Sequence, residues 1–253
     1  MKKTLTALTL GMSLSLHANA DFIGIYAGAG TISYDLSADF TDLTGGATQI
    51  DLENDLGLKG DSGNYFYVAF EHPIPFLPNV KISHSDISES GTTTLNREIV
   101  FDGKTFPAGA EVVSTADFTH NDFTFYYEFL DNWVNLDLGV TARQFDGEIS
   151  GQASLQGNTV TATQPLDFVA PMLYGMAQFD LPFTGLYVQA SGNWVGFGGA
   201  QLMDLWAKLG YEFSFGLGVE AGFRKLTAEL DDVDDTDADI TLDGTYLAAT
   251  FHF

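Results

Sequence analysis

The chain has 253 residues, a formal net charge of −24 and no cysteine. The lack of cysteine excludes disulfides, thiolate metal sites and cysteine nucleophiles, and 34 acidic against 10 basic residues argue against nucleic acid as a partner, because phosphates need Lys and Arg. Phe and Gly are abundant, with 21 and 27 residues, which is typical of strands and turns.

The first twenty residues have the three parts of a secretory signal peptide. Lys2 and Lys3 are followed by an apolar run and then by Ala-Asn-Ala. The apolar run is far shorter than the roughly 20 residues that a membrane-spanning helix needs, which argues against an N-terminal anchor. We therefore expect 1–20 to be a signal peptide cleaved after Ala20. Residues 21–253 then form a single domain with a formal net charge of −26, since cleavage removes two lysines and no acid.

The mature chain contains ten segments in which apolar and polar residues alternate, each long enough to cross a membrane as a tilted strand of about 9–11 residues. In chain order the segments are 22–34, 64–72, 79–88, 118–130, 133–145, 168–180, 184–194, 202–213, 216–228 and 242–253.

The connections between these segments alternate between long and short. The long ones are 35–63, 89–117, 146–167 and 229–241, the connection 195–201 is moderate, and the others are tight. Outer-membrane barrels have short periplasmic turns and long external loops. We therefore predict an all-β fold, a single transmembrane antiparallel β-barrel of ten strands with long external loops and short periplasmic turns. Alternating stretches at 92–101 and 152–162 indicate that strands extend above the membrane.

The two faces of the predicted strands differ in charge. One face carries uninterrupted apolar rows, such as the alternate residues of 123–129 and 134–142. A lipocalin-like barrel also alternates, with its apolar face inward, but such a barrel accounts for neither the sorted connections nor the aromatic end of the chain. We assign the apolar face to lipid and the other face to the lumen. The lumen face holds Glu71, Lys81, Asp122, Glu128, Asp137, Arg143, Asp204, Lys208, Glu212, Glu220 and Arg224.

Aromatic residues gather at the short-turn ends of the segments, as expected for a girdle at one membrane interface. The predicted periplasmic girdle includes Phe129, Trp133, Phe179, Phe183, Tyr211, Phe213, Phe251 and Phe253.

The last ten residues, Gly244 to Phe253, alternate strictly and end on an aromatic residue. With this strand the chain resembles Gram-negative outer-membrane β-barrels, whose last strand is recognised by the barrel-assembly machinery. Segments 50–58, 69–78 and 173–182 are similar to motifs of a family of small outer-membrane barrels without established function. The resemblance covers the mature chain and implies the outer membrane of a Gram-negative bacterium as its location. Its implied partners are the bilayer, lipopolysaccharide and the assembly machinery, and it implies no activity and no cofactor.

The charges of the lumen face predict an ion-pair network. Glu71 and Lys81 flank a tight turn almost symmetrically. Further candidate pairs are Asp137 with Arg143, and those within the group Lys208, Glu212, Glu220 and Arg224. Enclosed charges must be paired or hydrated, and a ten-stranded barrel is little wider than the eight-stranded kind that side chains fill. We favour a structural or surface-interaction protein with a largely occluded lumen over a narrow, cation-preferring channel for small solutes. The predicted network is Glu71, Lys81, Glu128, Asp137, Arg143, Lys208, Glu212, Glu220 and Arg224.

The ninth connection is the most acidic stretch of the chain. Its spacing imitates the start of an EF-hand loop, but Ile240 and Tyr246 stand where that loop needs Gly and Glu. We expect a solvated acidic loop and no specific metal site, with diffuse divalent cations bridging to lipopolysaccharide as a weaker alternative. The candidate ligands are Asp231, Asp232, Asp234, Asp235, Asp237 and Asp239.

An enzymatic role is a remote alternative. Omptins are ten-stranded outer-membrane proteases that use rim Asp and His residues, and this chain has His84, Asp86, His120 and Asp122 near external strand ends. The alternation places the first two outward and the last two inward. We therefore expect no catalysis by these residues and no enzyme, while an omptin-like surface hydrolase stays the third candidate function.

Overall fold

The computed structural model describes residues 23–42, 48–233 and 236–253. Its described residues form a closed antiparallel barrel of ten strands, as predicted, in which each strand pairs with its neighbours along the chain and β1 pairs with β15. The ten strands are β1 (Gly24–Asp42), β3 (Ser62–Glu71), β4 (Asn79–Asp86), β9 (His120–Leu130), β10 (Val134–Leu155), β11 (Asn158–Asp180), β12 (Leu186–Phe197), β13 (Ala200–Glu212), β14 (Leu217–Val233) and β15 (Thr236–His252). Within these ranges no helix is long and apolar enough to cross a membrane.

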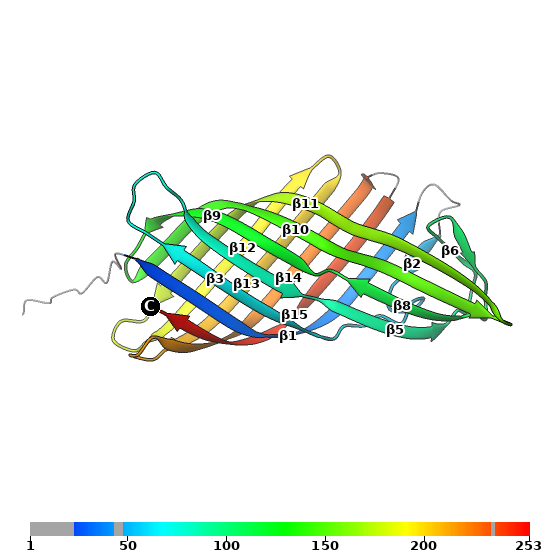
Figure 1. Cartoon of the computed structure of the whole chain (residues 1–253), viewed down its shortest axis with the longest axis horizontal. Helices are drawn as coiled ribbons and strands as arrows, with labels where there is room; N and C mark the ends of the chain where they lie inside the picture. Colours follow the sequence, from blue (N-terminus) through cyan, green and yellow to red (C-terminus); the bar gives the residue numbers. More distant parts are fainter. Residues whose placement is uncertain (1–22, 43–47, 234–235) are drawn as a thin grey trace, which may run out of the picture.

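Several strands are much longer than a membrane crossing. β10 and β11 have 22 and 23 residues, and they run to a tight turn at Gln156 and Gly157, both with positive φ. The predicted connection 146–167 is therefore two paired strands, because its alternation continues past the membrane level. Figure 1 shows both strands reaching the end of the molecule opposite to the C-terminus.

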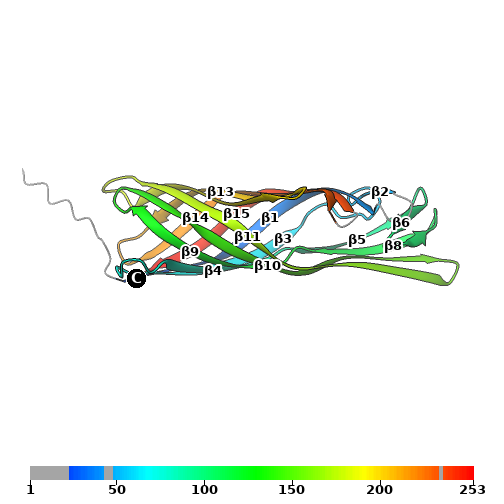
Figure 2. The ribbon, with the colours of Figure 1, turned by 90° about the horizontal axis from the view of Figure 1, so that it is seen from above.

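Five shorter strands complete this end of the barrel. β5 (Ser88–Thr94) and β8 (Glu111–Asp117) continue the hairpin of β4 and β9, and β8 pairs with the upper part of β10. β2 (Gln49–Asp51) pairs with β1, and β6 (Ile99–Phe101) and β7 (Lys104–Phe106) form a separate hairpin. Figure 2 shows these strands together at the external end. We call this end, made of β2, β5–β8 and the strand parts beside them, the external half.

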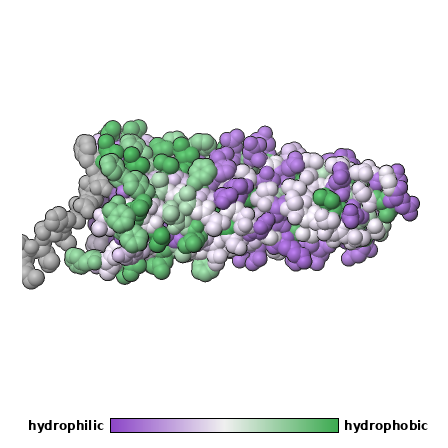
Figure 3. Space-filling model, turned by 60° about the horizontal axis from the view of Figure 1, so that its bottom comes forward, coloured by the Kyte–Doolittle hydropathy of each residue, from purple (hydrophilic) through white to green (hydrophobic). Residues whose placement is uncertain are grey.

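An apolar belt covers the half of the barrel that carries the short turns. In Figure 3 this part of the visible face is mostly hydrophobic and the external half mostly hydrophilic. The belt is as tall as a membrane crossing, because the strands present about ten residues each to it. Its exposed residues include Phe66, Val68, Phe123, Phe125, Leu138, Val140, Leu173, Leu205, Leu209, Val219, Phe223 and Leu247. The lipid-facing rows are therefore where the alternation placed them.

The external half has an apolar core of its own, which the sequence patterns did not predict. Leu58, Ile99 and Phe106 are each 0% exposed. The core forms because segment 50–58 and the β6–β7 hairpin fold inward between the extended strands. It contains Leu36, Phe40, Ile50, Leu52, Leu56, Leu58, Leu95, Ile99, Phe101, Phe106, Val112 and Ile149. This external core fills the barrel where long solvated loops were expected.

The segment that enters the external core is held by polar contacts. Leu36 N donates to Lys59 O at 3.1 Å, and Asp55 pairs with Arg97. The Glu89 carboxylate of β5 lies beside the backbone of Lys59 and Gly60. The segment thus links β1 to β5 and closes the gap beside the edge of β5.

The long upper edge of β11 has no strand paired to it among the described residues, and it carries two prolines. The pairing of β11 with β12 begins at Leu173, so the part of β11 above it has a neighbour only on the β10 side. Pro165 and Pro171 lie in this part. Proline lacks an N–H group and is tolerated at such an edge, where it also hinders the addition of a further strand.

We predict that Leu58→Ala loosens the external half while the membrane half stays folded. Deleting a fully buried leucine side chain costs about 2–5 kcal/mol. Trypsin should then cleave faster at Lys59, Arg97 and Lys104 in proteoliposomes. Leu247→Ala is the control, because Leu247 is 60% exposed on the belt and its truncation leaves the core intact. Equal cleavage rates for the Leu58 variant and the wild type would show that the core does not hold this half together.

The external half should also respond to pH through Glu89. Burial raises the pKa of this carboxyl above that of a glutamate in the unfolded chain. Its contribution to stability is therefore fully present below the unfolded pKa and is lost as the pH rises through the folded pKa. Glu89→Gln should narrow the difference in unfolding temperature between pH 4 and pH 8, measured by circular dichroism. The exposed Glu111 on β8 offers the matched control, Glu111→Gln, and equal narrowing by both changes would contradict the assignment to Glu89.

Candidate functional site

The charged residues predicted for the lumen lie at two levels inside the barrel. Arg143 and Arg224 belong to a compact network near the external end of the belt. The other seven line one cavity below the network: Glu71, Lys81, Glu128, Asp137, Lys208, Glu212 and Glu220.

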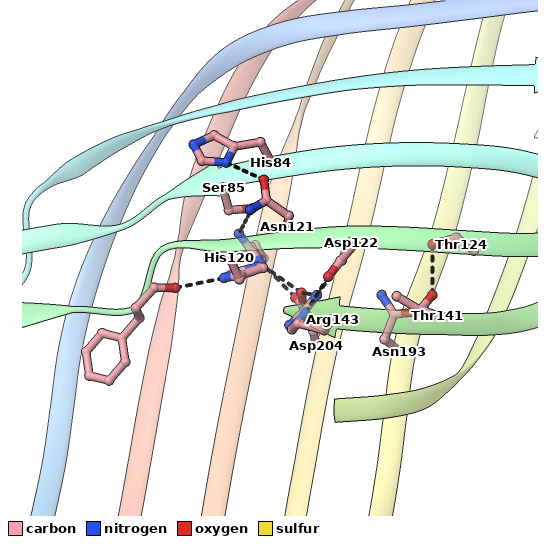
Figure 4. A network of polar contacts seen from close by, with 12 residues as sticks. His84, Ser85, His120, Asn121, Asp122, Thr124, Thr141, Arg143, Asn193 and Asp204 are labelled. Carbon is pink, nitrogen blue, oxygen red and sulfur yellow. Dashed lines mark hydrogen bonds and ion pairs between the residues drawn. The ribbon is translucent and has the colours of Figure 1, made fainter. Parts of the chain in front are cut away.

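The upper level is organised by one carboxylate, Asp204 of β13, which is 0% exposed. Its Oδ2 accepts from Arg143 Nη2 at 2.6 Å and from Arg224 Nη2 at 2.7 Å, and its Oδ1 accepts from Arg224 Nε at 2.9 Å. Arg143 also binds both oxygens of Asp122, at 2.7 and 2.8 Å. Figure 4 labels Asp122, Arg143 and Asp204 of this arrangement. Together with Arg224 we call these residues the Asp204 network.

The Asp204 network balances charge and connects opposite walls. Two aspartates meet two arginines, so no net charge is enclosed. Asp122 and Arg143 lie on β9 and β10, whereas Asp204 and Arg224 lie on β13 and β14. Bidentate contacts of this kind are the strong form of the Arg–carboxylate pair. The side chains therefore bridge the lumen from wall to wall.

His120 is bound into the same level. Its Nδ1 donates to Phe118 O at 2.8 Å, and its Nε2 accepts from Arg224 Nη2 at 2.9 Å, because a guanidinium group can only donate. Both ring nitrogens are thus engaged. His84 lies on the other face of the hairpin, beside Phe66 and bonded to Asn121. These two histidines do not converge, so their placement gives no support to a rim hydrolase.

A row of neutral polar side chains follows directly below. Thr124 and Thr141 share a hydrogen bond of 2.8 Å, and Thr141 donates to Asn193 at 2.7 Å. The space that remains beside this row and the Asp204 network is about 20 Å³. This is room for about one water molecule.

The lower level is a cavity of about 510 Å³, which we call the periplasmic vestibule. Its lining includes Asp131, Pro182 and Ser214, which belong to the short turns, so the cavity opens at that end of the barrel. Five tyrosines also line it: Tyr26, Tyr67, Tyr126, Tyr174 and Tyr187.

Two of the pairings expected inside the lumen are replaced by others. The register of β3 and β4 places Ala69 opposite Lys81, so Glu71 and Lys81 do not face each other. Glu71 accepts from Tyr126 OH at 2.7 Å, while Lys81 lies 5.1 Å from the Tyr67 ring. Asp137 is not the partner of Arg143. The two residues lie six positions apart on the same extended strand, which is too far for their side chains to meet.

Two of the other charges form an ion pair that two tyrosines join. Lys208 Nζ lies 3.4 Å from Glu220 Oε2, and Glu220 also accepts from Tyr187 and Tyr246. At the mouth, Glu212 lies 3.4 Å from His252. Glu128 accepts from Asn79 at 3.0 Å. Lys208–Glu220 and Asn79–Glu128 join neighbouring strands, whereas Glu220–Tyr187 and Glu212–His252 join strands that are not paired with each other.

All eight residues of the predicted aromatic girdle have exposed side chains at the short-turn end. Trp133 packs edge-on against Phe179, and Tyr211 against Phe213. Phe253 exchanges backbone hydrogen bonds with Ile25, so the last residue is paired to β1. The eight are Phe129, Trp133, Phe179, Phe183, Tyr211, Phe213, Phe251 and Phe253.

The acidic stretch 229–241 is largely strand, because β14 ends at Val233 and β15 begins at Thr236. Of the candidate metal ligands, Asp234 and Asp235 lie outside the described residues, and the side chain of Asp232 does too. In the part of the chain that the structure describes, no group of three or more His, Asp or Glu residues could hold a metal ion. Asp231, Asp237 and Asp239 therefore form no described ligand set.

Comparisons with known proteins agree with the fold. No family model and no curated sequence matches the chain. The outer membrane protease OmpT of Escherichia coli matches with a TM-score of 0.54 and 11% identity, over 92% of this chain and 97% of that one. The attachment invasion locus protein Ail of Yersinia pestis matches with a TM-score of 0.34 and 11% identity, over 90% and 99%. At such identities the likeness to OmpT shows the fold alone, which is that of a Gram-negative outer-membrane β-barrel.

The Asp204 network leads to a prediction about stability. Asp204→Asn leaves two buried guanidinium groups without their shared anion, and breaking a buried ion pair costs about 3–5 kcal/mol. The variant should unfold at a lower temperature in the gel assay that separates folded from unfolded barrels. Asp243→Asn, the same change at an exposed outer position, should leave that temperature unaltered. Equal unfolding temperatures for the two variants would show that the network does not stabilise the barrel.

Proposed function

We propose that this outer-membrane barrel does not conduct solutes and acts through its external half, as a structural or surface-interaction protein. The proposal is supported by two layers of packed side chains that cross the lumen. The Asp204 network spans the barrel at the level where the belt ends, and the external core fills the space above it. A solute would have to break buried ion pairs and then displace an apolar core.

The surface of the external half supports an interaction role. Asp39 faces Asp51 on one side and Asp239 on the other, and Asp239 faces Glu229. Like charges directly opposite each other in a sheet are destabilising. A basic partner, or divalent cations that bridge to lipopolysaccharide phosphates, would relieve this repulsion. The acidic row is therefore the part of the surface that we assign to contacts outside the cell.

A narrow, cation-preferring channel is the second candidate. Its supporting observation is the acidic periplasmic vestibule, which already forms a wide entrance at one end. Conduction would require the Asp204 network and the external core to open. The two candidates therefore differ in whether these layers separate under a membrane voltage.

Planar-bilayer recording distinguishes the two candidates. We predict no conductance steps above the background of empty bilayers for the purified wild-type barrel, because its lumen is closed at two levels. The same recording on Arg224→Ala and Lys208→Ala variants serves as a comparison. Wild-type steps whose size or cation preference changes in these variants would contradict the closed lumen and favour the channel.

A further inference from the structure

The periplasmic vestibule contains a buried carboxylate without a partner. Asp137 of β10 is 3% exposed and lines the cavity. Its side chain has no hydrogen bond or ion pair within the described residues. The charges that act on it are those of Glu71, Glu128 and Asp131, against one lysine, Lys81, which is not within ion-pair distance. A buried charge is costly unless it is paired. The position of Asp137 therefore points to a positively charged group that comes from outside the chain.

The overall charge of the vestibule also favours a positively charged ligand. Lys208 is occupied by Glu220, and Lys81 lies over the rings of Tyr67 and Tyr174 at 5.1 and 5.9 Å. Two lysines thus face seven acidic residues, and a small anion would meet an excess of like charge. The acidic residues of the lining are Glu71, Glu128, Asp131, Asp137, Asp180, Glu212 and Glu220.

The tyrosines of the vestibule suit an organic cation. The rings of Tyr126 and Tyr174 lie 5.9 Å apart beside the cavity. Aromatic faces attract ammonium groups within about 6 Å of the ring centre. Lys81 already uses the Tyr174 ring in this way.

The volume of the vestibule and the arrangement of its acidic residues favour an organic cation over a bare metal ion. The volume of about 510 Å³ lies within the range of small-molecule sites. The described acidic residues include no group of three or more arranged to hold a metal ion. A primary ammonium group needs no such arrangement, because it offers three hydrogen-bond donors on a flexible chain.

We propose that the periplasmic vestibule binds a small aliphatic amine, whose ammonium group pairs with Asp137 beside Tyr126 and Tyr174. In a diamine, the second ammonium group lies toward the acidic mouth, near Asp131 and Asp180. Entry is from the short-turn end, so binding needs no opening of the Asp204 network. The proposal is therefore independent of whether the barrel conducts.

Titration calorimetry on the purified full barrel in detergent tests this site with 1,4-diaminobutane as the probe. We expect saturable binding to the wild type, weakened at least tenfold in Asp137→Asn and several-fold in Tyr174→Leu. Asp243→Asn removes the same charge from the outer surface and should bind as the wild type does. The neutral analogue 1,4-butanediol should show no saturable binding.

Three results would overturn the proposal. The first is no saturable binding of the diamine to the wild type, and the second is equal binding by the wild type and Asp137→Asn. The third is that Mg²⁺ binds more tightly than the diamine in a way that depends on Asp137, or that the dianion glutarate does so in a way that depends on Lys81. The shift of the folded band on gels confirms that each variant is folded, and Asp137→Glu, which retains the charge, should recover part of the affinity.

Discussion

One enclosed carboxylate determines how the interior of this barrel is built. Asp204 is fully buried and receives two guanidinium groups from β10 and β14. Taking such charges out of water is costly, and their mutual attraction compensates only when the geometry is good and the remaining donors are bound. Asp122, His120 and Ser85 supply further contacts, while Arg143 Nη1 is buried without a hydrogen-bond partner among the described residues. The network therefore links opposite walls of the barrel and fills the lumen between them with paired charges.

The layers on either side of the network follow from the solvent that each meets. Below it, the outer face is apolar because it contacts lipid, while the inner face is polar and encloses a vestibule open to water. Above it, the outer face contacts water, so the apolar residues of the connecting segments turn inward and form the external core. The barrel thus reverses its polarity between the membrane half and the external half.

The sequence predicted the features that depend on local periodicity. The ten strands, the sorted turns and the lipid-facing rows follow from alternation, which belongs to each strand alone. Periodicity did not predict the external core, because Leu58, Ile99 and Phe106 lie in connections that are far apart in the chain and share no repeating pattern. The lumen charges were identified as a set, and the group that contains Lys208 and Glu220 includes a pair that forms, but most of the partners were not identified. Arg143 and Asp204 are 61 residues apart, and only the closed barrel brings them together.

The central claim is that the Asp204 network is dry and intact in the membrane. The chain has three arginines, so the side-chain Nε–H region of a ¹⁵N nuclear magnetic resonance spectrum contains three signals. Arg97 is 43% exposed and acts as the internal reference for Arg143 and Arg224, which are 1% and 4% exposed. In lipid nanodiscs at neutral pH we expect the Arg143 and Arg224 signals to exchange with water much more slowly than that of Arg97. Equally fast exchange of all three would show that water passes the network and would contradict a closed lumen.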